Sequence, residues 1–254
     1  MRMRMRMKAA VAASMALMLS VGTADASIVA FDNFDYPDGS LVPNGGWANH
    51  SGTAGDLLVE SGQAVVQHGT PSEDANKPFA TGTGAIYYGI DFSIDDLTAP
   101  FAGTDFEYFA HFSDGGTFNF VARLDVQAPT GSGDYTVGIA TASSTADATW
   151  GTDLTYGTVY RAIVRYDQDG SQAQLWINPA LESDTSILGA DLTDPGLTVS
   201  AFALRQSDSS ENETIRVDNL VVGTTFGDVL HPVPEPATLA LMAFGGLALL
   251  RRRR

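Results

Sequence analysis

The feature that most limits the fold of this chain is a short alternation of apolar and polar residues. Between Ser27 and Asp228 the alternation recurs in runs of five to eight residues, and no run keeps the 3.6-residue period of a helix. Alternating runs predict β-strands that place one face on a core. The predicted strands lie at 86–92, 106–112, 118–124, 135–139, 160–166, 173–177 and 215–222.

Turn-forming residues separate these predicted strands. Asp114-Gly115-Gly116 lies between two aromatic runs, and Asp167-Gln168-Asp169-Gly170-Ser171 predicts a hairpin between Tyr166 and Ala173. Many strands of this length predict an all-β domain, a two-sheet sandwich of the jelly-roll type. We assign residues 27–230 to this domain, and a chain of that length can bury a substantial core.

Three stretches, taken in order, resemble a known architecture. They are the opening segment 31–36 with Gly46-Trp47, the hairpin formed by 160–166 and 175–179, and the closing segment 216–226. Together they resemble the laminin-G or concanavalin-like jelly rolls of exported bacterial proteins, over most of residues 31–229. The resemblance implies that the last strand returns beside the first. It does not select a function, because lectins, glycosidases and proteins of unknown role share this architecture.

Charge is distributed very unevenly along the chain. Of 14 basic residues, eight lie in the two ends, as Arg2, Arg4, Arg6, Lys8 and Arg251 to Arg254. The segment between Ser27 and His231 therefore carries six basic and 28 acidic residues, a formal net charge of −22. Such a segment repels phosphates, so we expect no nucleic-acid partner.

Residues 1–26 have the three parts of a secretory signal peptide. Met1 to Lys8 is basic, residues 9–21 are mostly apolar, and Ala24 and Ala26 are small residues at the positions that signal peptidase requires. At about 1.5 Å per residue this apolar segment reaches roughly 20 Å, less than the ~30 Å of a bilayer core. We therefore expect cleavage after Ala26, rather than a permanent anchor, and a mature chain that begins at Ser27.

The C-terminal end, 231–254, has a different order of parts. Alternating prolines are followed by an uncharged apolar segment, residues 237–250, and by four arginines, Arg251, Arg252, Arg253 and Arg254. The prolines keep the preceding chain extended, and the arginines favour the cytoplasmic side. The apolar segment spans only about 20 Å as a helix, so we expect transient association with the inner membrane.

Residues 233–254 resemble the PEP-CTERM sorting signal of Gram-negative bacteria. The resemblance rests on Pro234-Glu235-Pro236, the short apolar helix and the terminal arginines. It implies removal of the tail near the tripeptide by exosortase, a membrane-embedded cysteine protease. It further implies a secreted protein of the cell surface or exopolysaccharide (biofilm) matrix. A plain C-terminal anchor that follows a few prolines is the alternative.

The residues give little support for an enzyme. The Glu-x-Asp-x-x-Glu motif of laminarinase-like jelly rolls is absent, and the clusters Asp95-Asp96 and Glu211-x-Glu213 lie in segments that read as loops. Glu107 is expected to project with Phe109 and His111 from a solvated or half-covered face, away from Tyr108 and its neighbours. The domain contains six glutamates: Glu60, Glu73, Glu107, Glu182, Glu211 and Glu213.

Cofactor sites are also few. The chain contains no cysteine, and it has no Gly-x-Ser-x-Gly nucleophile motif. Its four histidines, His50, His68, His111 and His231, lack ligand spacing, so we expect no transition-metal site. Calcium remains possible, because Asp167 and Asp169 resemble the first half of a calcium loop; a plain turn explains the same residues.

A glycan-binding face is the remaining candidate. Trp176 is expected to project opposite to Leu175 and Ile177, and Arg161 and Arg165 likewise point away from the apolar sets of their strands. An exposed ring beside such polar groups suits a sugar. We therefore expect a structural or adhesive matrix protein without enzymatic activity. A lectin-like glycan-binding module is the alternative, and a glycoside hydrolase ranks third.

Overall fold

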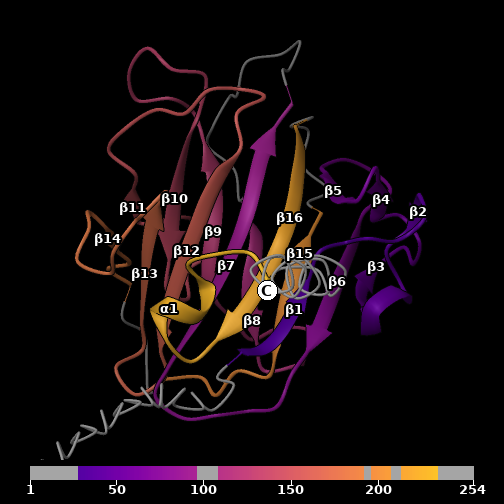
Figure 1. Ribbon diagram of the computed structural model, residues 1–254, viewed down its shortest axis with the longest axis horizontal. Helices are drawn as coiled ribbons and strands as arrows, with labels where there is room; N and C mark the ends of the chain where they lie inside the picture. Colours follow the sequence, from indigo (N-terminus) through magenta and orange to yellow (C-terminus); the bar gives the residue numbers. More distant parts are fainter. Residues whose placement is uncertain (1–27, 96–107, 192–195, 207–212, 234–254) are drawn as a thin grey trace, which may run out of the picture.

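The structure is a computed structural model that describes residues 28–95, 108–191, 196–206 and 213–233. The predicted signal peptide and the sorting signal from Pro234 onward lie outside these ranges, as do Glu107 and Glu211. In the described ranges the chain forms two β-sheets that pack face to face (Figure 1). The predicted all-β sandwich is therefore confirmed.

The first sheet has the strand order β14–β13–β12–β7–β16–β5–β4–β2, with β1 beside β16. Its strands are β1 (Ile28–Asp32), β2 (Gly39–Ser40), β4 (Leu58–Glu60), β5 (Gln63–Gln67), β7 (Ala85–Ile94), β12 (Tyr160–Asp167), β13 (Gln172–Ile177), β14 (Ile187–Leu188) and β16 (Thr214–Gly223).

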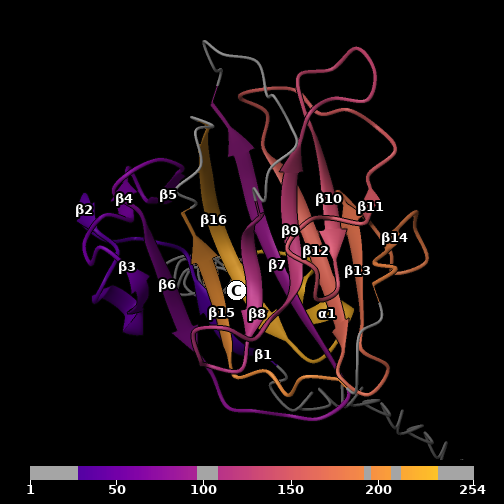
Figure 2. The same cartoon turned by 180° about the vertical axis from the view of Figure 1, so that it is seen from behind.

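The second sheet, seen in front in Figure 2, has the order β11–β10–β9–β8–β15–β6–β3. Its strands are β3 (Ala48–Gly52), β6 (Glu73–Pro78), β8 (Tyr108–Ser113), β9 (Phe120–Gln127), β10 (Thr136–Ala140), β11 (Ala148–Thr149) and β15 (Ala201–Arg205). Two short helical segments complete the fold, η1 (Asn44–Gly46) and α1 (Phe226–Val229).

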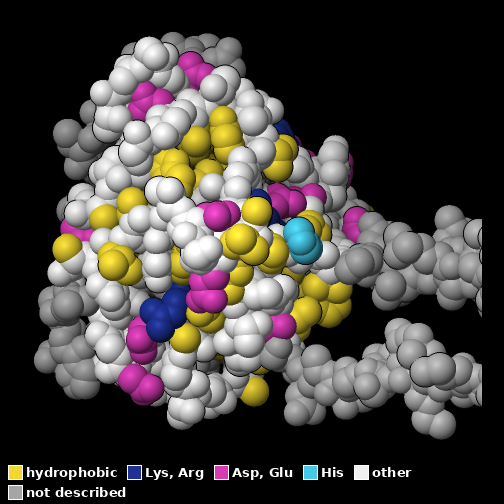
Figure 3. All heavy atoms as spheres, turned by 60° about the vertical axis from the view of Figure 1, so that its left-hand side comes forward, with side chains coloured by type: hydrophobic (Ala, Val, Ile, Leu, Met, Phe, Trp, Pro, Cys, Tyr) yellow, Lys and Arg dark blue, Asp and Glu magenta, His cyan; other side chains and the backbone are white. Residues whose placement is uncertain are grey.

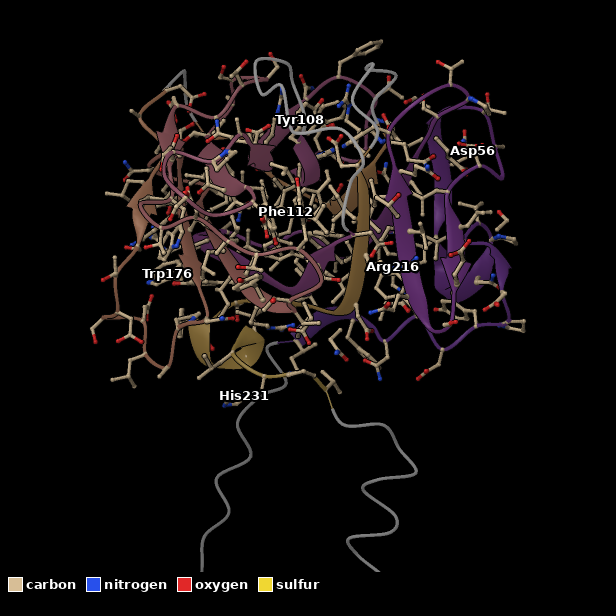
Figure 4. All side chains as sticks on the ribbon, turned by 90° about the horizontal axis from the view of Figure 1, so that it is seen from above. Asp56, Tyr108, Phe112, Trp176, Arg216 and His231 are labelled. Atoms are coloured by element: carbon tan, nitrogen blue, oxygen red, sulfur yellow. The ribbon has the colours of Figure 1, made fainter. Side chains whose placement is uncertain are left out.

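Aromatic side chains from both sheets fill the space between them. The ring of Phe112 on β8 lies 5.0 Å from that of Tyr88 on β7, and Tyr88 lies 5.1 Å from Phe202 on β15. Figure 4 shows Phe112 between the two sheets. These side chains are fully buried, and such burial supplies the main driving force for folding.

Several predicted elements are found where the sequence places them. The 167–171 turn joins β12 to β13 as a hairpin in which Asp167 pairs with Gln172. The closing strand β16 lies antiparallel to β1, with Ile28 opposite Gly223. Strand β7 lies between β12 and β16 over most of its length, as a central strand with a buried alternating pattern does.

The predicted faces of β8 are confirmed for Ala110, His111 and Phe112, but they are wrong for Tyr108 and Phe109. Phe109 packs into the core with its ring 5.7 Å from Phe92, whereas Tyr108 and His111 lie together, 5.5 Å apart, outside that core. The register between β8 and β9 shifts on either side of Ala110. A shift of this kind changes which residues share a face, so strict alternation fails.

The predicted strand 118–124 begins too early. Strand β9 starts at Phe120, and Phe118 is 88% exposed in the preceding loop. Asp114 closes that loop, because its carboxylate accepts hydrogen bonds from Gly116 N (2.8 Å) and Asn119 Nδ2 (2.7 Å). The alternation of aromatic residues therefore begins in the loop before the strand, and it does not mark where the strand starts.

A C-terminal strap, residues 226–233, covers part of the outer face of the first sheet. It begins at α1, where Thr225 and Asp228 form a capping box. Phe226 and Val229 are buried against Tyr87, Ile163, Trp176 and Val221, and Leu230 and Val233 pack beside them. No helix in the described residues has the length and apolar character needed to cross a bilayer.

Two fully buried histidines make stability depend on pH. Burial, as the main cause, lowers the pKa of both His68 and His111 to about 3. In the unfolded chain histidine titrates near 6.5, so the unfolded state binds more protons between these values and stability falls as pH drops below about 6.5. Asp218, whose pKa is raised to about 6, changes stability in the opposite direction.

We therefore predict that His111→Phe reduces the loss of stability on acidification. Between pH 7 and pH 5.5 the variant should lose about 1 kcal/mol less unfolding free energy than the wild type. Urea unfolding at the two pH values measures this difference. A variant with the same pH response as the wild type would show that His111 titrates normally.

Candidate functional site

The structure buries the predicted sugar-binding tryptophan. Trp176 is 1% exposed, its ring lies 5.3 Å from Phe226 of the strap, and its Nε1 donates to the carbonyl of Glu182 at 3.2 Å. The prediction of an exposed ring is therefore wrong. Trp176 does project away from the main core, but the strap covers that side of the sheet.

The two predicted arginines are also engaged by their own chain. Arg161 donates from Nη1 to Asp91 Oδ1 (3.1 Å) and from Nη2 to the carbonyl of Val229 (2.8 Å), which fastens the strap. Arg165 pairs with Asp167 at 2.9 Å. On the face in Figure 3, acidic side chains are scattered among hydrophobic ones, and few basic side chains are visible.

The weak calcium candidates form a turn. Asp167 Oδ1 accepts hydrogen bonds from the backbone N–H groups of Asp169 and Gly170, both at 3.1 Å. The bond from Gly170 is the largest cause that lowers the pKa of Asp167. Among the described residues, no three His, Cys, Asp or Glu side chains form a group able to hold a metal ion. The turn interpretation accounts for the positions of both aspartates.

A small hollow of about 90 Å³ lies beside β7 and β16 on the outer face of the first sheet. Asp91 and Asp218 line it from directly opposed positions of the two strands. Burial, as the main cause, raises the pKa of Asp218 to about 6, and the neighbouring Asp91 contributes. Asp91 is held by Arg161 and by Asn219 Nδ2 (2.8 Å), so Asp91 supports the strap through Arg161.

A larger pocket, of about 370 Å³, opens where β5 leads into β6. We call it the Asp56 pocket. Its lining combines a carboxylate, amides and a hydroxyl with apolar groups, as ligand pockets of roughly 300–1,000 Å³ commonly do. The lining residues are Asp56, Leu58, Gln67, His68, Gly69, Thr70, Pro71 and Gln206. Figure 4 places Asp56 far from Trp176, on the opposite flank of the sandwich.

Glu73, at the start of β6, holds one wall of this pocket. Its side chain is fully buried; Oε2 accepts the N–H groups of Gly55 and Leu57, both at 2.9 Å, and Oε1 accepts Asn49 Nδ2 at 3.0 Å. The backbone N–H of Glu73 donates to Gln206 Oε1 at 2.8 Å. The buried carboxylate thus fixes the loop that carries Asp56, and the backbone N–H of the same residue holds the Gln206 amide.

A second buried pair lies at the floor. His68 Nε2 lies 3.5 Å from Glu213 Oε1, and neither side chain is exposed. The pKa of His68 is lowered to about 3, first by burial and then by the charge of Arg205, so the ring is neutral at physiological pH. His68 therefore adds no positive charge to the pocket lining.

Asp56 itself is the available acceptor at the rim. Its side chain is partly exposed, and its carboxylate accepts no hydrogen bond from the described residues. Burial raises the pKa of Asp56, and the charge of Glu73 adds to this effect. The carboxylate is therefore placed to accept hydrogen bonds from a ligand.

Local sequence patterns give little indication of this site. Asp56, Gln67 and Gln206 lie near turns and carry no motif, and His68 has no partner at ligand spacing. Glu73 stands in a Pro-Ser-Glu-Asp segment that resembles a loop. A buried glutamate is rare in proteins, and its position between polar neighbours hides that burial from pattern analysis.

Comparison with known proteins identifies the C-terminal segment. Residues 232–254 match the family described as the PEP-CTERM protein-sorting motif. The predicted sorting signal is therefore confirmed, and the motif indicates an exported protein that exosortase processes. No curated protein sequence matches the chain significantly.

The fold is similar to known jelly rolls. The Lotus tetragonolobus seed lectin (isoform) matches with a TM-score of 0.50 at 12% identity, over 78% of this chain and 98% of the lectin chain. A sialidase matches with a TM-score of 0.53 at 14% identity, over 87% of this chain but 21% of the sialidase. At such identities the likeness shows the fold alone.

Proposed function

We propose that this chain is an adhesive protein of the Gram-negative cell surface or exopolysaccharide matrix, and that it retains polysaccharide in the Asp56 pocket. The sorting motif supports export, and one similar fold belongs to a protein named as a lectin. The observation that carries the proposal is the pocket itself. Glu73 holds the loop that carries Asp56, and the Asp56 carboxylate lies beside amide and apolar groups without a hydrogen bond from the described residues.

The lining suits a sugar ring. Gln67, Thr70 and Asp56 offer donors and acceptors for hydroxyl groups, and Leu58 and Pro71 offer apolar surface for the C–H side of the ring. Binding without catalysis is favoured, because the oxygens of Glu73 are occupied by N–H donors of the same chain. A proton-transfer group needs access to the substrate.

Filling the pocket tests this proposal. We predict that Thr70→Tyr, at the exposed rim, reduces retention of the mature protein on matrix polysaccharides by at least tenfold. Thr158→Tyr, on an exposed loop outside the pocket lining, should bind like the wild type. Retention is measured by pull-down on immobilised polysaccharides.

Equal retention of both variants would place binding elsewhere. Absence of retention of the wild type on every polysaccharide tested would contradict the glycan role and favour a purely structural one.

A further inference from the structure

The charges around the Asp56 pocket indicate which sugars it takes. Of the residues that line it, Asp56 and His68 are ionisable, and His68 is held neutral by its surroundings. The charge at the rim is therefore negative. An acidic sugar placed there would face this carboxylate without a cation among the lining residues to balance it.

More carboxyl groups lie behind the lining. Glu73 accepts two backbone N–H groups from the loop that carries Asp56, and Glu213 lies beside His68. The cation that acts on these groups is Arg205, whose charge helps to lower the pKa of His68 and whose guanidinium lies 4.3 Å from the ring centroid of Tyr108. Arg205 is not among the lining residues, and the carboxyl groups of Asp56, Glu73 and Glu213 outnumber this one cation.

The whole domain adds to this local charge. The segment between Ser27 and His231 carries 28 acidic and six basic residues. A field of this sign raises the local concentration of cations and lowers that of anions. The charge at the pocket and the charge of the whole domain thus both favour a positively charged ligand.

The uncharged lining residues indicate which groups the ligand carries besides a positive charge. A protonated primary amine donates up to three hydrogen bonds, and a carboxylate is its strongest acceptor. Gln67, Thr70 and the Nε2 group of Gln206 are left to bond hydroxyl groups, since Gln206 Oε1 already accepts from the backbone N–H of Glu73. Leu58 and Pro71 cover a C–H surface. A ligand with one ammonium group on a polyhydroxylated ring uses all of these groups, whereas the alkyl chain of a lysine leaves the amides without partners.

We infer that the Asp56 pocket selects amino sugars that carry a free, protonated amine, such as those of a deacetylated glucosamine polymer. This inference rests on the proposed glycan-binding function and names its ligand class. Asp56 binds the ammonium group, and the amides and the hydroxyl bind the ring.

The test compares three oligosaccharides of equal length on the full mature protein: deacetylated glucosamine, N-acetylglucosamine and a uronic acid. Calorimetry at low salt should give at least tenfold tighter binding of the deacetylated oligomer than of the acetylated one, and no binding of the uronic acid. Asp56→Asn should remove this preference and leave binding of the acetylated oligomer within about threefold. Asp169→Asn, the same charge change on a distant turn, should preserve the preference.

Other outcomes would overturn the inference in distinguishable ways. Equal binding of the acetylated and deacetylated oligomers would refute the amine selectivity and leave the glycan function intact. A lysine oligomer that binds as tightly as the amino sugar would show a general cation site. Failure of every oligosaccharide would refute the proposed function together with its ligand class.

Discussion

Trp176→Ala is expected to lower the unfolding free energy by about 3–5 kcal/mol, the usual effect of removing a buried aromatic side chain. The indole ring is buried and holds Phe226 of the strap against the first sheet. Its loss leaves a cavity under the strap and also removes the hydrogen bond to Glu182. Urea unfolding of the domain measures the change.

Phe118→Ala is the matched control, because Phe118 is 88% exposed. It should change stability by less than about 0.5 kcal/mol, as surface substitutions usually do. If Trp176→Ala were as stable as this control, the strap would not be docked in solution. The outer face would then be open, and the original sugar-binding interpretation of Trp176 would return.

Glu73→Gln is expected to destabilise the domain by about 2–4 kcal/mol, because buried groups lose charge-assisted hydrogen bonds. The amide keeps the shape of the side chain, but one end becomes a donor. In the wild type both oxygens accept, from the N–H groups of Gly55 and Leu57 and from Asn49. At least one of these donors must lose its partner in the variant.

The same substitution should also weaken polysaccharide retention, since Glu73 fixes the loop that carries Asp56. Glu182→Gln provides the control, because Glu182 is exposed and accepts one hydrogen bond from Tyr87. Urea unfolding and the polysaccharide pull-down are measured on the same preparations. Wild-type stability of Glu73→Gln would contradict the assigned network, whatever the pull-down shows.

The parts of the fold that the sequence predicts are those in which local pattern and burial agree. Strands β7, β12 and β13 alternate clearly, and the 167–171 turn carries residues that favour a hairpin. Strand β6 has the sequence Glu-Asp-Ala-Asn-Lys-Pro, yet Glu73 and Ala75 are fully buried in it. Its burial depends on neighbouring strands that are distant in sequence, which no local pattern reports.

The sequence does not predict the candidate site for a related reason: its surroundings are set by segments that are distant along the chain. Alternation shows that Trp176 leaves the main core, but it does not show whether solvent or another segment lies beyond. The covering segment, residues 226–233, is 50 residues further along the chain. Asp56 lies in a pocket because Glu73 binds its loop and Gln206, 150 residues further along the chain, lines the same space.

The two ends of the domain lie together, because Ile28 pairs with Gly223 directly before the strap begins. Figure 4 shows His231 on the side of the strap and Asp56 on the far side of the sandwich. A molecule held at either end of its domain therefore carries Asp56 on the side of the sandwich away from its point of attachment.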